Sequence, residues 1–150
     1  MKMVILVGLP GSGKSTYAKD QNGFEVINQD LLGNRQKCIN KTKELLKQGK
    51  SVIIDRTNIN RKQRNHWLEI AKEFEIPVLC IIFKISPELA KERVENRKNH
   101  PTIKEGTSKE KIDEIITMFE KSYEEPELSE GFHSITTYIP PRIFQDNKDT

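Results

Sequence analysis

The chain has 150 residues, of which 35% are hydrophobic and 31% charged, and its formal net charge is +3. This length fits a single domain with a hydrophobic core, and the composition excludes a disordered or membrane-embedded protein. The 2 cysteines exclude a disulfide scaffold, and no apolar run approaches the length of a membrane span. We therefore expect an intracellular protein, cytoplasmic or nuclear, with no disulfide partner and no membrane contact. We expect one domain over residues 1–144 and a polar tail over 145–150.

The first predicted elements are a buried strand and a glycine-rich loop. Residues 3–7 are an uninterrupted apolar run, which is typical of a central strand in a parallel sheet. The residues that follow match G-x-x-x-x-G-K-[ST] and lead into a short helix that Asn22-Gly23 ends. In such a loop the backbone N–H groups converge on phosphate, the lysine reaches the β- and γ-phosphates, and the serine hydroxyl ligates Mg²⁺. The sequence therefore predicts a nucleoside-triphosphate site, for ATP and Mg²⁺, formed by Gly8, Leu9, Pro10, Gly11, Ser12, Gly13, Lys14, Ser15 and Thr16.

Strands and helices alternate along the rest of the chain. Short apolar runs predict strands over 24–28, 51–55, 78–85 and 134–139. Helical periodicity and capping residues predict helices over 31–48, 60–74, 86–98 and 108–123. This alternation indicates a three-layer α/β fold, in which helices flank a central parallel sheet of about five strands. Ligands of such sheets bind beyond the carboxyl ends of the strands.

Charged side chains follow the predicted strands at that edge. Asp55 closes the strand over 51–55 and is the candidate on the metal side of the site. Asp30 follows the strand over 24–28, where it either takes the proton of an acceptor hydroxyl or caps the next helix. Arg93 and Arg97 share one face of a helix, because they are four residues apart. They either stabilise charge on a transferred phosphate or form a solvated face with nearby glutamates.

Positive charge is concentrated in one segment of the sequence. Residues 28–66 contain ten basic and three acidic side chains, a local charge of +7, whereas residues 67–150 carry −5. This distribution favours a polyanionic partner in addition to the nucleotide. The alternative is that the lysines over 41–50 only solvate the face of a helix.

Longer motifs cover most of the chain, from Met3 to about Ile139. They are G-L-P-G-S-G-K-S-T at 8–16, V-I-N-Q-D-L-L-G at 26–33, Q-K-C at 36–38, L-K-Q-G-K-S-V-I-I-D-R-T-N at 46–58, E-N-R at 95–97 and Y-E-E-P-E-L-S-E-G-F at 123–132. With these motifs the sequence resembles the kinase module of the bifunctional polynucleotide kinase/phosphatases. The resemblance implies a P-loop kinase fold and transfer of the γ-phosphate of ATP to the 5′-hydroxyl end of DNA or RNA. It also implies that Asp30 is the general base and that Lys14, Arg93 and Arg97 contact the phosphates.

The sequence departs from this family where the acceptor would bind. Gln29 replaces an arginine that relatives often have, and Arg56 interrupts their D-N-T-N motif. We expect the nucleic acid to be held by Arg35, Lys37, Arg56, Arg61 and Arg64, and the protein to be a monomer. Two alternatives remain: a kinase for a small sugar, nucleoside or nucleotide, and a non-catalytic module whose binding is gated by nucleotide.

Overall fold

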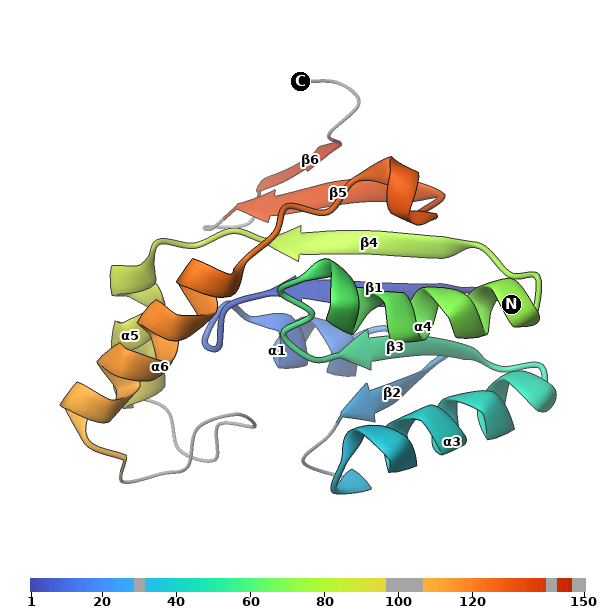
Figure 1. The fold of residues 1–150 in the computed structure, drawn as a ribbon, viewed down its shortest axis with the longest axis horizontal. Helices are drawn as coiled ribbons and strands as arrows, with labels where there is room; N and C mark the ends of the chain where they lie inside the picture. Colours follow the sequence, from blue (N-terminus) through green and yellow to red (C-terminus); the bar gives the residue numbers. More distant parts are fainter. Residues whose placement is uncertain (29–31, 97–106, 140–142, 147–150) are drawn as a thin grey trace.

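The computed structural model describes residues 1–28, 32–96, 107–139 and 143–146. At its centre is a six-stranded sheet with the strand order β2-β3-β1-β4-β5-β6 (Figure 1). The strands are β1 (Met3–Gly8), β2 (Phe24–Asn28), β3 (Ser51–Asp55), β4 (Val78–Phe83), β5 (Ser134–Ile139) and β6 (Ile143–Asp146). The first five are parallel, and β6 pairs antiparallel with β5. Because the order reverses at β1, its carboxyl end is where an open α/β sheet binds its ligand.

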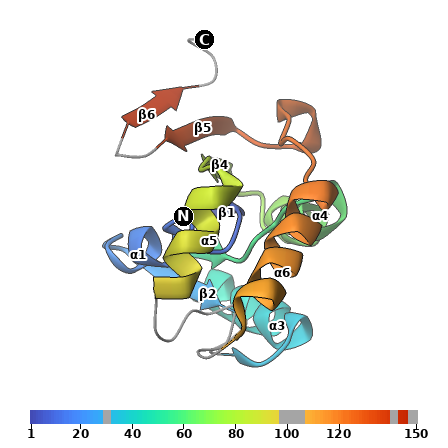
Figure 2. The same ribbon diagram turned by 90° about the vertical axis from the view of Figure 1, so that its left-hand side faces the viewer.

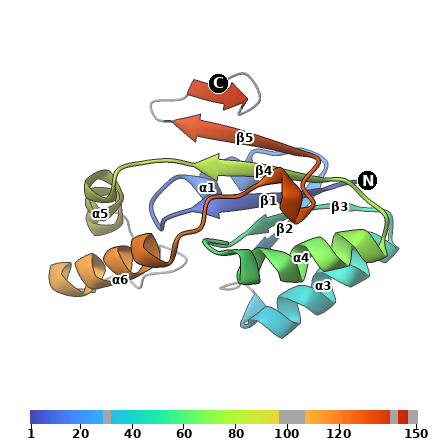
Figure 3. The same cartoon turned by 45° about the horizontal axis from the view of Figure 1, so that its top comes forward.

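Helices cover both faces of this sheet. They are α1 (Lys14–Lys19), α3 (Arg35–Lys47), α4 (Arg61–Glu73), α5 (Pro87–Asn96) and α6 (Lys109–Ser122). The α3 and α4 helices lie on one face and α1 lies on the other, whereas α5 and α6 pack side by side beyond the strand ends (Figures 1, 2 and 3). Within the residues that the structure describes, no helix combines the length and the apolar character needed to cross a bilayer.

Three apolar clusters hold the layers together. The largest lies between the sheet and α3 and α4, and it includes Trp67 and Ile54. The second joins the sheet to α1, where the rings of Tyr17 and Phe83 pack edge to face with centroids 5.6 Å apart. The third lies between α5 and α6 and includes Leu9 of the glycine-rich loop. The α5–α6 pair is therefore packed directly against that loop.

Capping side chains set the helix starts as the sequence predicts. The side-chain oxygens of Asn60 and Ser108 accept hydrogen bonds from the backbone N–H groups of Gln63 and Lys111, at 2.9 and 3.2 Å. Each bond satisfies one of the N–H groups that a helix start leaves without a partner in the helix.

Several predicted boundaries are corrected. The helix predicted over 31–48 begins as α3 at Arg35, because Asn34 caps it after Gly33, whose φ is 101°. The β4 strand ends at Phe83 instead of residue 85. The sequence analysis also missed the strand β6, which extends to Asp146. Its Gln145 and Asp146, which we expected in the tail, pair with Thr137 and Thr136.

Candidate active site

The glycine-rich loop connects β1 to α1 at the carboxyl edge of the sheet. Gly13 is the N-cap of α1 and has a φ of 99°, a left-handed conformation that glycine adopts without steric cost. A Cβ atom on Gly8 would lie 2.8 Å from the carbonyl oxygen of Phe83, so only glycine lets β1 leave the sheet so close to β4. The predicted loop residues therefore form the curved backbone that phosphate binding requires.

The Lys14 side chain is buried within this loop. Its ammonium group donates hydrogen bonds to the carbonyl oxygens of Gly8 and Leu9, at 2.8 and 2.9 Å, and to the Ser12 hydroxyl at 3.2 Å. The side chain is 8% exposed. These bonds hold the charge at the start of the loop, in reach of an anion seated above the loop.

Three polar side chains meet beside the loop. The Ser15 hydroxyl donates to Oδ2 of Asp55 at 2.8 Å, and the Asn28 side-chain amide donates to the same oxygen at 3.0 Å. Asp55 is 6% exposed. Asn28 and Asp55 are in register at the ends of β2 and β3, and this register brings the amide to the carboxylate. Ser15 and Asp55, the predicted metal ligands, therefore lie side by side, and Asn28 joins them although the sequence analysis did not single it out.

This oxygen set fits a hard divalent cation. A hydroxyl and a carboxylate are the protein ligands that Mg²⁺ accepts at nucleotide sites, where water and phosphate oxygens complete its octahedron. Among the described residues no group of three or more His, Cys, Asp or Glu side chains is placed to hold a metal.

The end of β3 is anchored to β1 by Asn58. Its side-chain amide donates to the carbonyl oxygen of Leu6 at 2.8 Å, and the backbone N–H of Gly8 donates to the Thr57 carbonyl oxygen at 3.1 Å. Asn58 has a φ of 47°, which asparagine tolerates better than most residues. Asn58 is thus a positioning residue for the loop, and its place in the D-R-T-N motif was the available sequence signal.

Asn58 is held in turn by a buried ion pair. The guanidinium of Arg64 donates to both carboxylate oxygens of Glu130, at 2.9 and 3.1 Å, and to the carbonyl oxygen of Asn58 at 3.0 Å. The Arg64 side chain is 0% exposed. The prediction that Arg64 contacts nucleic acid is therefore wrong, because its charge is buried and its donors are used internally.

The other predicted nucleic-acid contacts differ in their surroundings; they are Arg35, Lys37, Arg56 and Arg61. Arg35 and Arg56 follow β2 and β3 at the carboxyl edge, and the Arg56 guanidinium lies 5.9 Å from the ring centroid of Trp67. Burial lowers the pKa of Arg56 from its usual value, and the charge of Arg35 lowers it further, while Cys38 partly opposes the shift. Arg61 instead pairs with Glu127 at 2.9 Å, so its charge is balanced. Lys37 is exposed on the first turn of α3.

His66 adjoins the cations at this edge. Its Nε2 atom is buried and has no hydrogen-bond partner among the described residues. Burial lowers the pKa of His66, and the charges of Arg35, Arg56 and Lys62 lower it further against the opposite effect of Glu69. We therefore expect a neutral imidazole beside the arginines at neutral pH.

The remaining predicted site residues are Asp30, Arg93 and Arg97. Nη1 of Arg93, on α5, lies 3.4 Å from the carbonyl oxygen of Gly11, so this arginine is beside the phosphate loop. Asp30 and Arg97 lie outside the described residues. Both cysteines are buried, and burial raises the pKa of Cys80 to about 12, in keeping with a packing role.

The fold and site define a P-loop protein, with a phosphate loop on β1 and a carboxylate at the end of the adjacent β3. The AAA domain family matches residues 34–122, and the chain belongs to that family. The "Bifunctional polynucleotide phosphatase/kinase" of Schizosaccharomyces pombe is 39% identical over 99% of this chain. A "Putative bifunctional polynucleotide phosphatase/kinase" of Acanthamoeba polyphaga mimivirus is 35% identical over 98% of it. The resemblance seen in the sequence motifs is confirmed, although the chain spans only 36% of the length of each relative.

Solved structures confirm the P-loop fold. A fungal RNA kinase superposes with a TM-score of 0.71 at 15% identity, and the match covers 97% of this chain and 77% of that one. Kti12 of Chaetomium thermophilum, solved in complex with ADP-AlF3, gives a TM-score of 0.68 at 19% identity over 93% of this chain and 89% of that one. At such identities the likeness concerns the fold alone.

Proposed function

We propose that this chain is a polynucleotide 5′-hydroxyl kinase module that transfers the γ-phosphate of ATP to the 5′ end of DNA or RNA. The observation that carries the proposal is that a complete phosphate loop and two arginines, Arg35 and Arg56, lie at one edge of the sheet. The names of the aligned relatives support a polynucleotide as the acceptor. We further propose that the protein is monomeric and intracellular.

Phosphoryl transfer needs positioning and electrostatic stabilisation more than covalent chemistry. In the proposed reaction the loop N–H groups and Lys14 bind the phosphates, and Arg93 adds positive charge from α5. Ser15 and Asp55 would hold Mg²⁺, which neutralises phosphate charge when it is bound. Asp30 accepts the proton of the 5′-hydroxyl, as the family resemblance implies. Arg97 joins Arg93 at the phosphates.

The metal assignment predicts a specific defect for Asp55→Asn. The substitution preserves the size of the side chain but removes the charge at the proposed Mg²⁺ position, so we expect an apparent Mg²⁺ affinity at least about 10-fold weaker. Titration of the transfer rate against the free Mg²⁺ concentration, at a fixed concentration of ATP, measures this value. Binding of ATP without Mg²⁺ serves as the control and should change little. An unchanged Mg²⁺ requirement would contradict the assignment.

The proposed nucleic-acid contacts predict that Arg35 and Arg61, which are both exposed, differ in their effect on the salt dependence of KM. Arg35→Ala should reduce the slope of log KM for the oligonucleotide against log salt by about 1, because one phosphate contact is lost. Arg61→Ala is the matched control, since Glu127 already neutralises that charge. Equal slopes in the two variants would remove Arg35 from the proposed surface.

Transfer of labelled γ-phosphate to matched DNA and RNA oligonucleotides with 5′-hydroxyls tests the function directly. We expect product with the unmodified protein and none with Asp30→Asn, which should bind ATP normally because only the proton acceptor is lost. If the unmodified protein binds Mg-ATP but phosphorylates neither oligonucleotide, the proposed function is wrong. If Asp30→Asn loses ATP binding as well, Asp30 has a structural role instead.

A further inference from the structure

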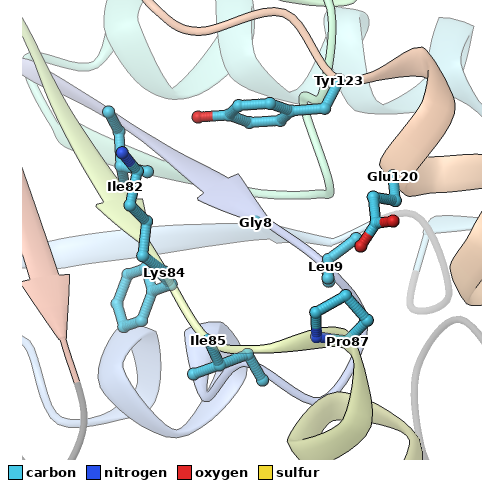
Figure 4. A pocket seen from close by; sticks show the side chains of 9 residues that line it. Gly8, Leu9, Ile82, Lys84, Ile85, Pro87, Glu120 and Tyr123 are labelled. Atoms are coloured by element: carbon cyan, nitrogen blue, oxygen red, sulfur yellow. The ribbon is translucent and has the colours of Figure 1, made fainter.

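The two sides of the carboxyl end of β1 differ in polarity. On the β4 side a cavity of about 160 Å³ adjoins Gly8 between the ends of β1 and β4, the start of α5 and the end of α6, and aliphatic side chains such as Ile85 and Pro87 form part of its wall (Figure 4). On the β3 side lies the buried carboxylate of Asp55, with the amide of Asn28 beside it. The reaction proposed above uses the carboxylate and leaves the amide without a role.

Asn28 is a buried polar residue at the end of β2. It is 8% exposed and follows Ile27, a fully buried residue of the core. An amide in such a place lowers stability unless it is hydrogen bonded. Five residue pairs already hold β2 and β3 in parallel register, so the strands do not need the amide in order to pair. The hydrogen bond from Asn28 to Asp55 therefore has a different purpose.

The Asp55 carboxylate needs donors of its own. It is 6% exposed, and a buried charge without hydrogen bonds is strongly destabilising. The Ser15 hydroxyl donates to Oδ2 at 2.8 Å and the Asn28 amide donates to the same oxygen at 3.0 Å. Only the N–H end of an amide can donate to a carboxylate, so this contact determines which way the Asn28 amide faces. Together the two donors fix the position of Oδ2.

The two donors differ in what they can do when a cation binds. The oxygen of the Ser15 hydroxyl is itself a proposed Mg²⁺ ligand, so Ser15 has to satisfy the cation and the carboxylate together. The N–H group of Asn28 cannot bind a cation, and it remains a donor to Asp55 alone. Residues that orient a metal ligand from behind typically change metal affinity by about 10-fold to 100-fold when they are lost.

We propose that Asn28 is a positioning residue for the metal site, whose amide holds the Asp55 carboxylate in the orientation in which Asp55 and Ser15 bind Mg²⁺. This inference rests on the metal assignment within the proposed function, and it does not depend on the identity of the acceptor. The register of β2 and β3 places the amide at the carboxylate, so the sheet itself supplies the positioning.

Asn28→Leu tests this role, because leucine is similar in size but donates no hydrogen bond. Calorimetric titration with ATP over a series of free Mg²⁺ concentrations, without any acceptor, measures how Mg²⁺ strengthens ATP binding. We expect the Mg²⁺ concentration for half of this effect to rise about 10-fold or more, with ATP binding in the absence of Mg²⁺ unchanged. Asn28→Ala, which has a smaller side chain, should give the same shift if leucine prevents folding. A folded variant with the Mg²⁺ dependence of the unmodified protein would overturn the inference.

Thr42→Val is the matched control for the loss of a buried hydrogen bond. The Thr42 hydroxyl is fully buried on α3 and donates to the carbonyl oxygen of Cys38 at 2.7 Å. We expect this variant to melt at a lower temperature with an unchanged Mg²⁺ dependence of ATP binding. An equal shift of the Mg²⁺ dependence in Thr42→Val and Asn28→Leu would mean that lost stability causes the shift, and this result would overturn the inference.

The double variant Asn28→Leu/Asp55→Asn tests whether Asn28 acts through the carboxylate. If it does, Asn28→Leu should add little to the Mg²⁺ defect of Asp55→Asn, because no carboxylate is left to orient. Defects that multiply in the double variant would overturn the inference. Failure of the unmodified protein to phosphorylate either oligonucleotide, with these Mg²⁺ effects on ATP binding intact, would contradict the proposed acceptor and still support the role of Asn28.

Discussion

Lys14→Met is expected to reduce phosphoryl transfer by at least about 10²-fold to 10³-fold, the usual cost of removing one charged donor from a transition-state site. The reason is the location of the ammonium group, which the carbonyl oxygens of Gly8 and Leu9 hold inside the loop. Methionine preserves the length and apolar body of the side chain but cannot neutralise phosphate charge. Single-turnover transfer of labelled phosphate at saturating ATP measures the chemical step directly.

Lys19→Met is the matched control for this substitution. Lys19 lies on the same helix, α1, but is exposed on its last turn. We expect normal transfer from this variant. A normal rate in both variants would remove Lys14 from the reaction, whereas a loss of transfer in both would indicate damage to α1 rather than to the phosphate site. Thermal unfolding of each variant separates these outcomes.

Arg64→Met is expected to lower the free energy of unfolding by about 3–5 kcal/mol, because it leaves the buried carboxylate of Glu130 without its partner. The side chains of Arg64 and Glu130 are 0% and 6% exposed, so water does not replace the lost hydrogen bonds. The substitution also removes the donor to the Asn58 carbonyl oxygen. Urea denaturation followed by tryptophan fluorescence reports the change, since Trp67 is buried on the same helix.

The double variant Arg64→Met/Glu130→Leu distinguishes an unpaired charge from a packing defect. If the cost is the unpaired carboxylate, replacing it with an apolar side chain should recover much of the lost stability. If the double variant is less stable than Arg64→Met alone, the pair acts mainly through packing. Arg61→Met is the comparison at an exposed pair, where we expect little change.

The phosphate loop could be predicted because its chemistry is encoded in consecutive residues. Gly8, Lys14 and Ser15 occur in one motif, and the buried strand before them fixes the loop at the sheet edge. The position of Asp55 at the loop edge could be predicted from the fold class, since strand ends that are far apart in sequence meet at the same edge. These predictions depended only on local pattern and on the general geometry of parallel sheets.

Other features could not be predicted because they depend on tertiary partners. Arg61 and Arg64 belong to the same basic segment of the sequence, yet the Arg61 side chain is exposed and the Arg64 side chain is fully buried. Only the position of residues 127–130 decides this difference. The β6 strand was missed because its four residues are too few to show a strand pattern, and its order depends on edge pairing with β5. The cavity beside Gly8 is formed by four separate elements, so no single motif marks it.

Gly11 sets the distance between α5 and the phosphate loop. A Cβ atom there would lie 2.8 Å from the carbonyl oxygen of Ala90 and 3.1 Å from a methyl group of Val94, both on α5. The absence of one methyl group therefore lets α5 rest directly on the loop, with Arg93 near the Gly11 carbonyl oxygen. In a chain with a bulkier residue at 11, α5 would be displaced from the loop and Arg93 would move away from the carbonyl oxygen of residue 11.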